Sequence, residues 1–213
     1  ANLGPFTGQL LVGEMNKPRI MRVMLEEVGG ELHGACIPFI DGSPLGRGCN
    51  RMDWAPDGSL FVGQTKHTWA GGQGIQRVSW NGKIPFEIRN MELSEKGFTF
   101  TFTQPVDKKS ALQKENWPFK RYFFEYRQAY GSPRSDEMEV EISKIEISGD
   151  GKIVEIFLSE LKPWHIHEVN IQNLKTPKGT PLSNGYIAYT LNRLHGKTPP
   201  DPLQIKIEPK KKS

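Results

Sequence analysis

The sequence of 213 residues predicts an all-β protein in two parts. Three observations support this: 22 glycines and 16 prolines separate short strand-like runs, one segment recurs about 50 residues later, and a strict Phe/Thr alternation opens the second part. Glycine and proline mark turns, and alternation with a period of two is typical of a strand with one buried face. No run approaches the roughly 20 apolar residues of a membrane-spanning helix, so no membrane span is predicted.

The first part contains an internal repeat. Residues 8–14 (GQLLVGE) recur as residues 58–64 (GSLFVGQ), and each copy is followed by a second strand-like run, at residues 19–23 and 74–78. A period of about 50 residues with several strands per unit is typical of a β-propeller blade. A propeller usually needs about four to eight blades, so we interpret residues 1–90 as the terminal blades of a partial propeller, with upstream blades of the same polypeptide as partners.

The second part, residues 91–195, predicts an antiparallel β-sandwich of five or six short strands. In residues 98–103, three phenylalanines share one strand face and three threonines the other. Residues 137–148 alternate with a change of phase, which predicts a bulge near Ser143 and Lys144. The other expected features are a hairpin turn at residues 149–151, a returning strand through Val154, Ile156 and Leu158, and strands over residues 164–171 and 186–191.

An aromatic insertion is expected at residues 115–133, where seven aromatic side chains gather. Two functional interpretations are a carbohydrate-stacking platform and an interface between the two parts; a simple extension of the sandwich core explains the cluster equally well. Of the two functional interpretations, packing between domains is favoured over glycan binding. The candidate ligand or interface residues are Trp117, Tyr122, Tyr126 and Tyr130.

The net charge of +4 is concentrated at the C-terminus. From Lys197 onward there are five lysines against Asp201 and Glu208, so this end carries +3 and the rest of the chain +1. A nucleic-acid-binding protein is expected to carry a basic stripe on its folded part, so this class is disfavoured. The proline- and lysine-rich residues 196–213 are interpreted as a linker or tail.

His165 and His167 have the best metal-like spacing in the chain. Residues two apart on a strand point to the same side, so both imidazoles can face one ion. A zinc site normally needs three or four protein ligands, and the third would be Glu168 or His195. The alternative, which is favoured, places Ile166 in the core and both histidines on the solvent face of an ordinary strand.

Cys36 and Cys49 flank a connection rich in glycine and proline. They are candidates for a disulfide worth about 3 kcal/mol in the loop-entropy model. The alternative is two buried thiols, and the choice depends on whether the Cα atoms lie within about 7 Å of each other. The sequence contains no CxxCH motif, so no c-type haem attachment is predicted.

Residues 8–14, 19–23, 50–63 and 75–78 resemble the last blades of glucose/sorbosone dehydrogenase-like propellers, the family of soluble quinoprotein sugar dehydrogenases. Residues 50–63 (NRMDWAPDGSLFVG) contain a run common to many propellers. Three segments of the second part resemble segments of bacterial Ig-like domains: residues 98–107, 147–152 and 161–182.

The resemblance implies the C-terminal region of a secreted or periplasmic, multidomain bacterial protein that is not catalytic by itself. No cofactor is assigned to this chain, and the full-length protein would bind pyrroloquinoline quinone and calcium. Loop residues that would contact the cofactor, or else are ordinary solvated side chains, are Arg47, Arg51, Lys66 and His67. The alternative function is a non-catalytic module that binds carbohydrate or protein, or acts as a scaffold.

Overall fold

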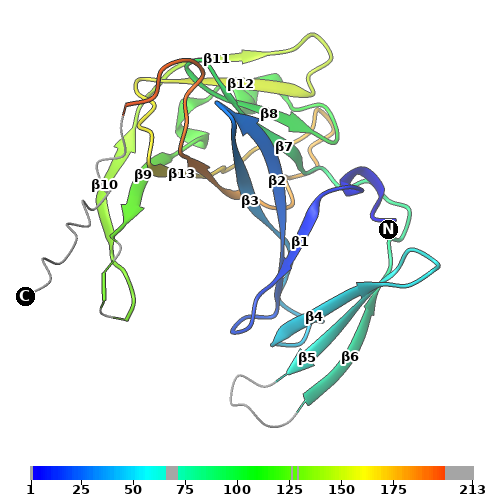
Figure 1. Ribbon diagram of the computed structural model, residues 1–213. Coiled ribbons are helices and arrows are strands. Elements are labelled where there is room, and N and C mark those ends of the chain that lie inside the picture. Colours follow the sequence, from blue (N-terminus) through cyan, green and yellow to red (C-terminus); the bar gives the residue numbers. More distant parts are fainter. Residues whose placement is uncertain (1, 66–71, 126, 129, 200–213) are drawn as a thin grey trace, which may run out of the picture.

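The computed structural model describes residues 2–65, 72–125, 127–128 and 130–199, and it shows an all-β protein, as predicted. The strands form three antiparallel sheets (Figure 1). Within the described residues, no helix is of the length and apolarity that crossing a membrane requires. Most of the predicted linker, residues 196–213, lies outside the described residues.

The largest sheet has seven strands in the order β1-β2-β3-β14-β13-β9-β10. Their bounds are β1 (Leu10–Gly13), β2 (Arg19–Val28), β3 (Glu31–Asp41), β14 (Tyr186–Leu191), β13 (His165–Asn170), β9 (Phe119–Phe124) and β10 (Arg134–Val140). The four-stranded sheet consists of β11 (Ile142–Ile147), β12 (Ile153–Leu158), β8 (Gly97–Phe102) and β7 (Ile88–Ser94). The three-stranded sheet consists of β4 (Cys49–Trp54), β5 (Leu60–Thr65) and β6 (Gly72–Val78). The short helices are η1 (Gly4–Phe6), α1 (Lys108–Ala111) and η2 (Lys114–Asn116).

The main core lies between the seven-stranded and four-stranded sheets. The three phenylalanines of β8 are fully buried there, which confirms the predicted strand face. Burying each of them contributes about 1.5–3 kcal/mol. The register of β11 with β12 shifts between Ile142 and Lys144, as the change of phase in the sequence predicted. The chain reverses between these strands at residues 148–152, so the expected hairpin is also confirmed.

The predicted boundary at residue 90 does not separate the sheets. Strand β3 pairs with β14, so strands from both predicted parts belong to one sheet. Met24, Val28 and Ile37 from the first part lie in the same core as the β8 phenylalanines. The sequence pattern predicted the strand at residues 186–191 but not β3. It contained no information on a pairing across about 150 residues, because side-chain alternation reports a strand's buried face and not its neighbour.

The aromatic segment is also not an insertion. Strand β9 lies inside the seven-stranded sheet, between β13 and β10. Trp117 is buried against Phe100 and Phe102, and its indole Nε1 donates a hydrogen bond to the Ala111 carbonyl. Trp117 and Phe119 are therefore part of the sandwich core.

The internal repeat is visible in the strand pairing. In the first copy Leu10 lies opposite Val23 and Leu11 opposite Arg22; in the second, Leu60 lies opposite Val78 and Phe61 opposite Arg77. The two hairpins, β1–β2 and β5–β6, therefore have the same register at equivalent residues. They lie in different sheets, and the three-stranded sheet packs beside the lower end of β1–β3 over a second, smaller core (Figure 1).

Candidate interaction interface

Each repeat hairpin presents two faces, because side chains alternate along a strand. We define face A as the side that carries Leu10, Val12, Met21 and Val23 in the first repeat, and Leu60, Val62, Gln76 and Val78 in the second. Face B is the opposite side and carries Leu11, Gly13, Ile20 and Arg22 in the first repeat, and Phe61, Gly63, Ile75 and Arg77 in the second.

Inside the molecule, face A of the second repeat packs on face B of the first. Leu60 and Val62 are 2% and 0% exposed, and they share a core with the fully buried Ile20 and with Leu11. At about 1.5–3 kcal/mol for each fully buried aliphatic side chain, this contact is a substantial part of what holds the three-stranded sheet in place.

The equivalent residues on the two remaining faces are exposed. On face A of the first repeat, Leu10 and Val12 are 52% and 45% exposed. On face B of the second repeat, Phe61 and Ile75 are 41% and 72% exposed. Equivalent apolar residues are thus buried where a neighbouring repeat is present and exposed where it is not, and contiguous exposed apolar residues mark interaction surfaces.

The two equivalent glycines on face B differ in how closely a neighbouring strand approaches them. A Cβ added to Gly13 would lie 2.0 Å from the carbonyl oxygen of Cys49, because β4 of the three-stranded sheet approaches β1 closely at this point. At the equivalent Gly63 the nearest atom would be the Cβ of Arg51 at 3.5 Å, an ordinary contact distance. Close backbone approach therefore requires glycine at position 13 and not at position 63.

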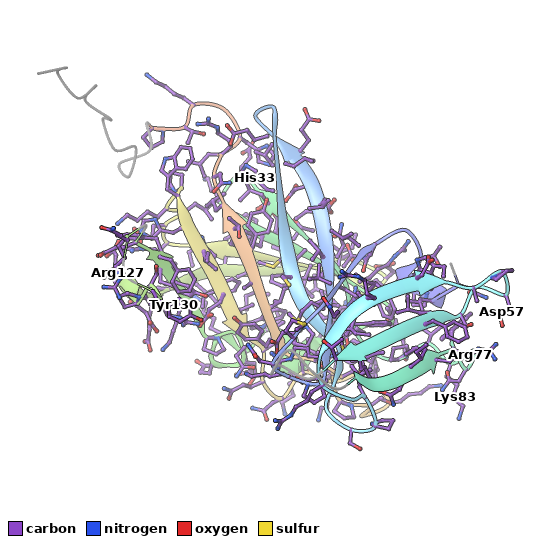
Figure 2. The ribbon with its side chains drawn as sticks, turned by 60° about the horizontal axis from the view of Figure 1, so that its bottom comes forward. His33, Asp57, Arg77, Lys83, Arg127 and Tyr130 are labelled. Carbon is purple, nitrogen blue, oxygen red and sulfur yellow. The ribbon has the colours of Figure 1, made fainter. Side chains whose placement is uncertain are left out.

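The arginines of face B occupy equivalent polar networks. Arg22 donates to the Gln9 side chain, and Arg77 donates to Ser59, the residue that replaces Gln9 in the second repeat. Arg77 also forms an ion pair with Asp57. Figure 2 shows Asp57 and Arg77 at the same outer end of the three-stranded sheet.

Arg22 lies near a second buried ionisable group, the carboxyl of Glu87. Its guanidinium is fully buried, lies 4.0 Å from the centre of the Phe6 ring and donates to the Ile88 carbonyl; burial lowers its pKa to about 10. Burial also raises the pKa of Glu87 to about 7, although its carboxylate accepts hydrogen bonds from the Ile88 amide and the Asn184 side chain. These groups join the first repeat to β7, and no motif in the sequence identified them.

Two of the four predicted cofactor residues are described by the structure, and both are exposed. Arg47 is exposed in the connection between β3 and β4. Arg51 is exposed on β4, where its guanidinium donates to its neighbour Asn50. The other two predicted residues, Lys66 and His67, lie outside the described residues.

The predicted aromatic residues do not form one platform. Trp117 and Tyr122 are buried, whereas Tyr130 is fully exposed. Figure 2 shows Tyr130 beside Arg127, at the opposite end of the molecule from Asp57. Tyr126 lies outside the described residues. Tyr122 stacks under the guanidinium of Arg134 at 3.9 Å, so its role is packing between strands.

The histidines face the core and not the solvent, contrary to the favoured interpretation. His165 and His167 are buried, while Ile166 is only partly buried on the other face. His167 packs on Phe98, and neither of its ring nitrogens has a hydrogen-bond partner. No group of three or more metal-ligating residues occurs in the part of the chain that the structure describes. The prediction that His165 and His167 share one face of the strand is confirmed, but that face is the buried one.

Asp136 binds three cationic or polar side chains, and no sequence pattern linked these residues. Its Oδ2 accepts from Arg121 at 2.6 Å, Lys162 at 2.5 Å and His165 Nε2 at 3.0 Å. Arg121 is buried and also donates to Glu160. These contacts, led by Lys162, hold the pKa of Asp136 far below its usual value. The cluster ties β10 to β9 and to the segment before β13.

Glu168 forms a second such tie on the outer face of the same sheet. It accepts two hydrogen bonds from Arg134, at 2.8 and 2.9 Å, and one from each hydroxyl of Tyr122 and Tyr186 at 3.1 Å. A two-pronged arginine–carboxylate pair is among the stronger polar contacts in proteins. Glu168 on β13 therefore connects to β9, β10 and β14, and it lies on the opposite face of its strand from His167.

The two cysteines are free thiols. Cys36 lies on β3 and Cys49 on β4, which belong to different sheets. Burial raises the pKa of both thiols, which makes them poor nucleophiles.

No protein-family model, no curated protein and no solved structure matches this chain. Support for a function therefore comes from the chain's own residues.

Proposed function

We propose that the chain is a non-catalytic structural segment of a larger β-propeller protein of the sugar-dehydrogenase-like class. The observation that supports this most directly is the pair of exposed repeat faces. In a propeller, each blade packs one face on the preceding blade and the other on the next. Face A of the first repeat and face B of the second are the two surfaces that neighbouring blades would cover.

The proposal places the chemistry in other parts of the polypeptide. The carboxylates of Glu87, Asp136 and Glu168 are each bound to groups that connect strands, so their roles are structural. Pyrroloquinoline quinone and calcium would be bound by upstream blades, and the sandwich would be an Ig-like domain that follows them. A periplasmic or extracellular location, which the resemblance to this class implies, is part of the proposal.

The test begins with the native coding sequence upstream of Ala1. We expect further units with the period of about 50 residues. The longer polypeptide should bind pyrroloquinoline quinone in the presence of calcium and reduce a dye when a sugar is added. The 213-residue chain is the control and should not reduce the dye.

Two outcomes would contradict different parts of the proposal. If no further repeats precede Ala1, the propeller assignment is wrong. If repeats are present but the longer polypeptide neither binds the quinone nor reduces dye with common aldoses, the dehydrogenase assignment is wrong and the structural role remains.

A further inference from the structure

We infer that the 213-residue chain associates head to tail, with face A of the first repeat of one copy docking on face B of the second repeat of another. The inference rests on the proposed function, because it uses the same two exposed faces. It states what binds to these faces when the 213-residue chain is present without further repeats. That partner is a second copy of this chain.

The interface inside the molecule is the template for the contact between copies. There, Leu60 and Val62 of face A pack with Leu11 and Ile20 of face B. Between copies the equivalent residues are Leu10 and Val12 on one side and Phe61 and Ile75 on the other. Three of these four positions keep the same residue as the template, and the fourth replaces leucine by phenylalanine. The same register in both hairpins places them at equivalent positions.

The charge of Arg77 does not oppose docking. Arg77 lies beside Phe61, with its guanidinium 6.0 Å from the ring centre. It is paired with Asp57 and hydrogen-bonded to Ser59, so a docked face A would cover a compensated charge. Covering an unpaired charge is what makes such burial costly.

The contact joins two different surfaces and is therefore not self-complementary. Each added copy leaves one face A and one face B free, so association continues until a ring closes or an open chain forms. This geometry predicts a series of sizes that grows with concentration, and not a single dimer.

The experiment is sedimentation velocity from about 5 μM to about 500 μM, a range that detects micromolar to submillimolar association. One variant, L10K/V12K, blocks face A, and another, F61K/I75K, blocks face B; both introduce lysine, so the two blocked faces repel each other. We expect the wild type to exceed its monomer mass of 24.1 kDa as concentration rises. Each variant alone should remain monomeric, and an equimolar mixture of the two should form heterodimers that grow no further.

A matched control tests whether any surface charge has the same effect. Ile153 is 42% exposed on the four-stranded sheet, away from both faces, and I153K should associate like the wild type. Circular dichroism verifies the fold of every variant, and L10S/V12T and F61S/I75T replace any charged variant that does not fold.

Three outcomes would overturn the inference: a wild type that stays at 24.1 kDa throughout, blocked variants that still associate, or a mixture that stays monomeric. None of these affects the proposed function, which is tested by the upstream sequence and by quinone binding. Conversely, head-to-tail association of this chain would persist if the dehydrogenase assignment failed.

Discussion

At the scale of single residues, the buried polar groups are the main departure from the sequence pattern. His167 is completely buried beside Phe98, and burial lowers its pKa to about 3, so the ring is neutral in the folded protein. The spacing of His165 and His167 correctly indicated a shared face. It did not indicate that this face is the buried one. Alternation of polar and apolar residues normally predicts that the polar residues face solvent, whereas in this strand the histidines face the core.

Glu87 makes the stability of the protein depend on pH. Its pKa is about 7 in the folded protein because the carboxylate is buried, against an ordinary value of 4.5. The folded state therefore holds a proton that the unfolded state has released. The resulting stabilisation is complete below pH 4.5 and is lost as pH rises through 7, with a total of about 3 kcal/mol.

The E87Q variant should remove this contribution, because the amide does not titrate. We expect the wild type to lose stability between about pH 5 and about pH 8, and E87Q to lose less by up to about 3 kcal/mol in urea unfolding. Glu92 is exposed on β7, the strand that begins just after Glu87, so E92Q is the control and should follow the wild type. Parallel pH profiles for E87Q and wild type would contradict the prediction.

At the scale of elements, equivalent positions in the two repeats behave differently because only one of them has a neighbour. Gly13 and Gly63 occur at the same place in the repeat, and the sequence gives no reason to distinguish them. The structure does distinguish them, since the Cys49 carbonyl lies against Gly13. The same comparison explains why Val62 is buried and Val12 exposed.

Alanine substitutions test this difference directly. G13A should destabilise the protein by about 2 kcal/mol or more, because the new methyl group would meet a backbone oxygen that cannot move without displacing β4. G63A should change stability by no more than about 0.5–1 kcal/mol, since its Cβ has room. Chemical unfolding measures both variants, and equal effects at the two positions would show that the close approach at Gly13 is absent.

At the scale of the whole molecule, the predicted two-part organisation is replaced by a shared sheet and a shared core. The β2–β3 hairpin pairs with β14 and supplies Met24, Val28, Ala35 and Ile37 to the sandwich core. Figure 1 shows this long hairpin running between the four-stranded sheet and the three-stranded sheet. The first repeat is thus attached to the sandwich by strand pairing and by apolar packing.

A truncated chain tests whether the sandwich is independent of the hairpin. Residues 86–199 retain every strand from β7 onward but lose the β3 partner of β14 and four core residues. We expect this fragment to lack a cooperative thermal transition, since losing several buried aliphatic side chains at about 2–5 kcal/mol each exceeds the usual stability of a domain. A sharp transition within a few degrees of the full chain would restore the predicted boundary near residue 90.

The local pattern of residues determined several of the strands, the β11 bulge, the buried phenylalanines and the repeat, but not β3, β4 or β7. These features depend on neighbours in the chain, where alternation and turn residues act directly. Tertiary structure alone decided which strands share a sheet, that His165 and His167 face inward, and that Asp136 and Glu168 collect partners from separate strands. It also decided which copy of each repeat face is buried. Equivalent residues in the two repeats are buried or exposed according to whether another part of the chain packs against them.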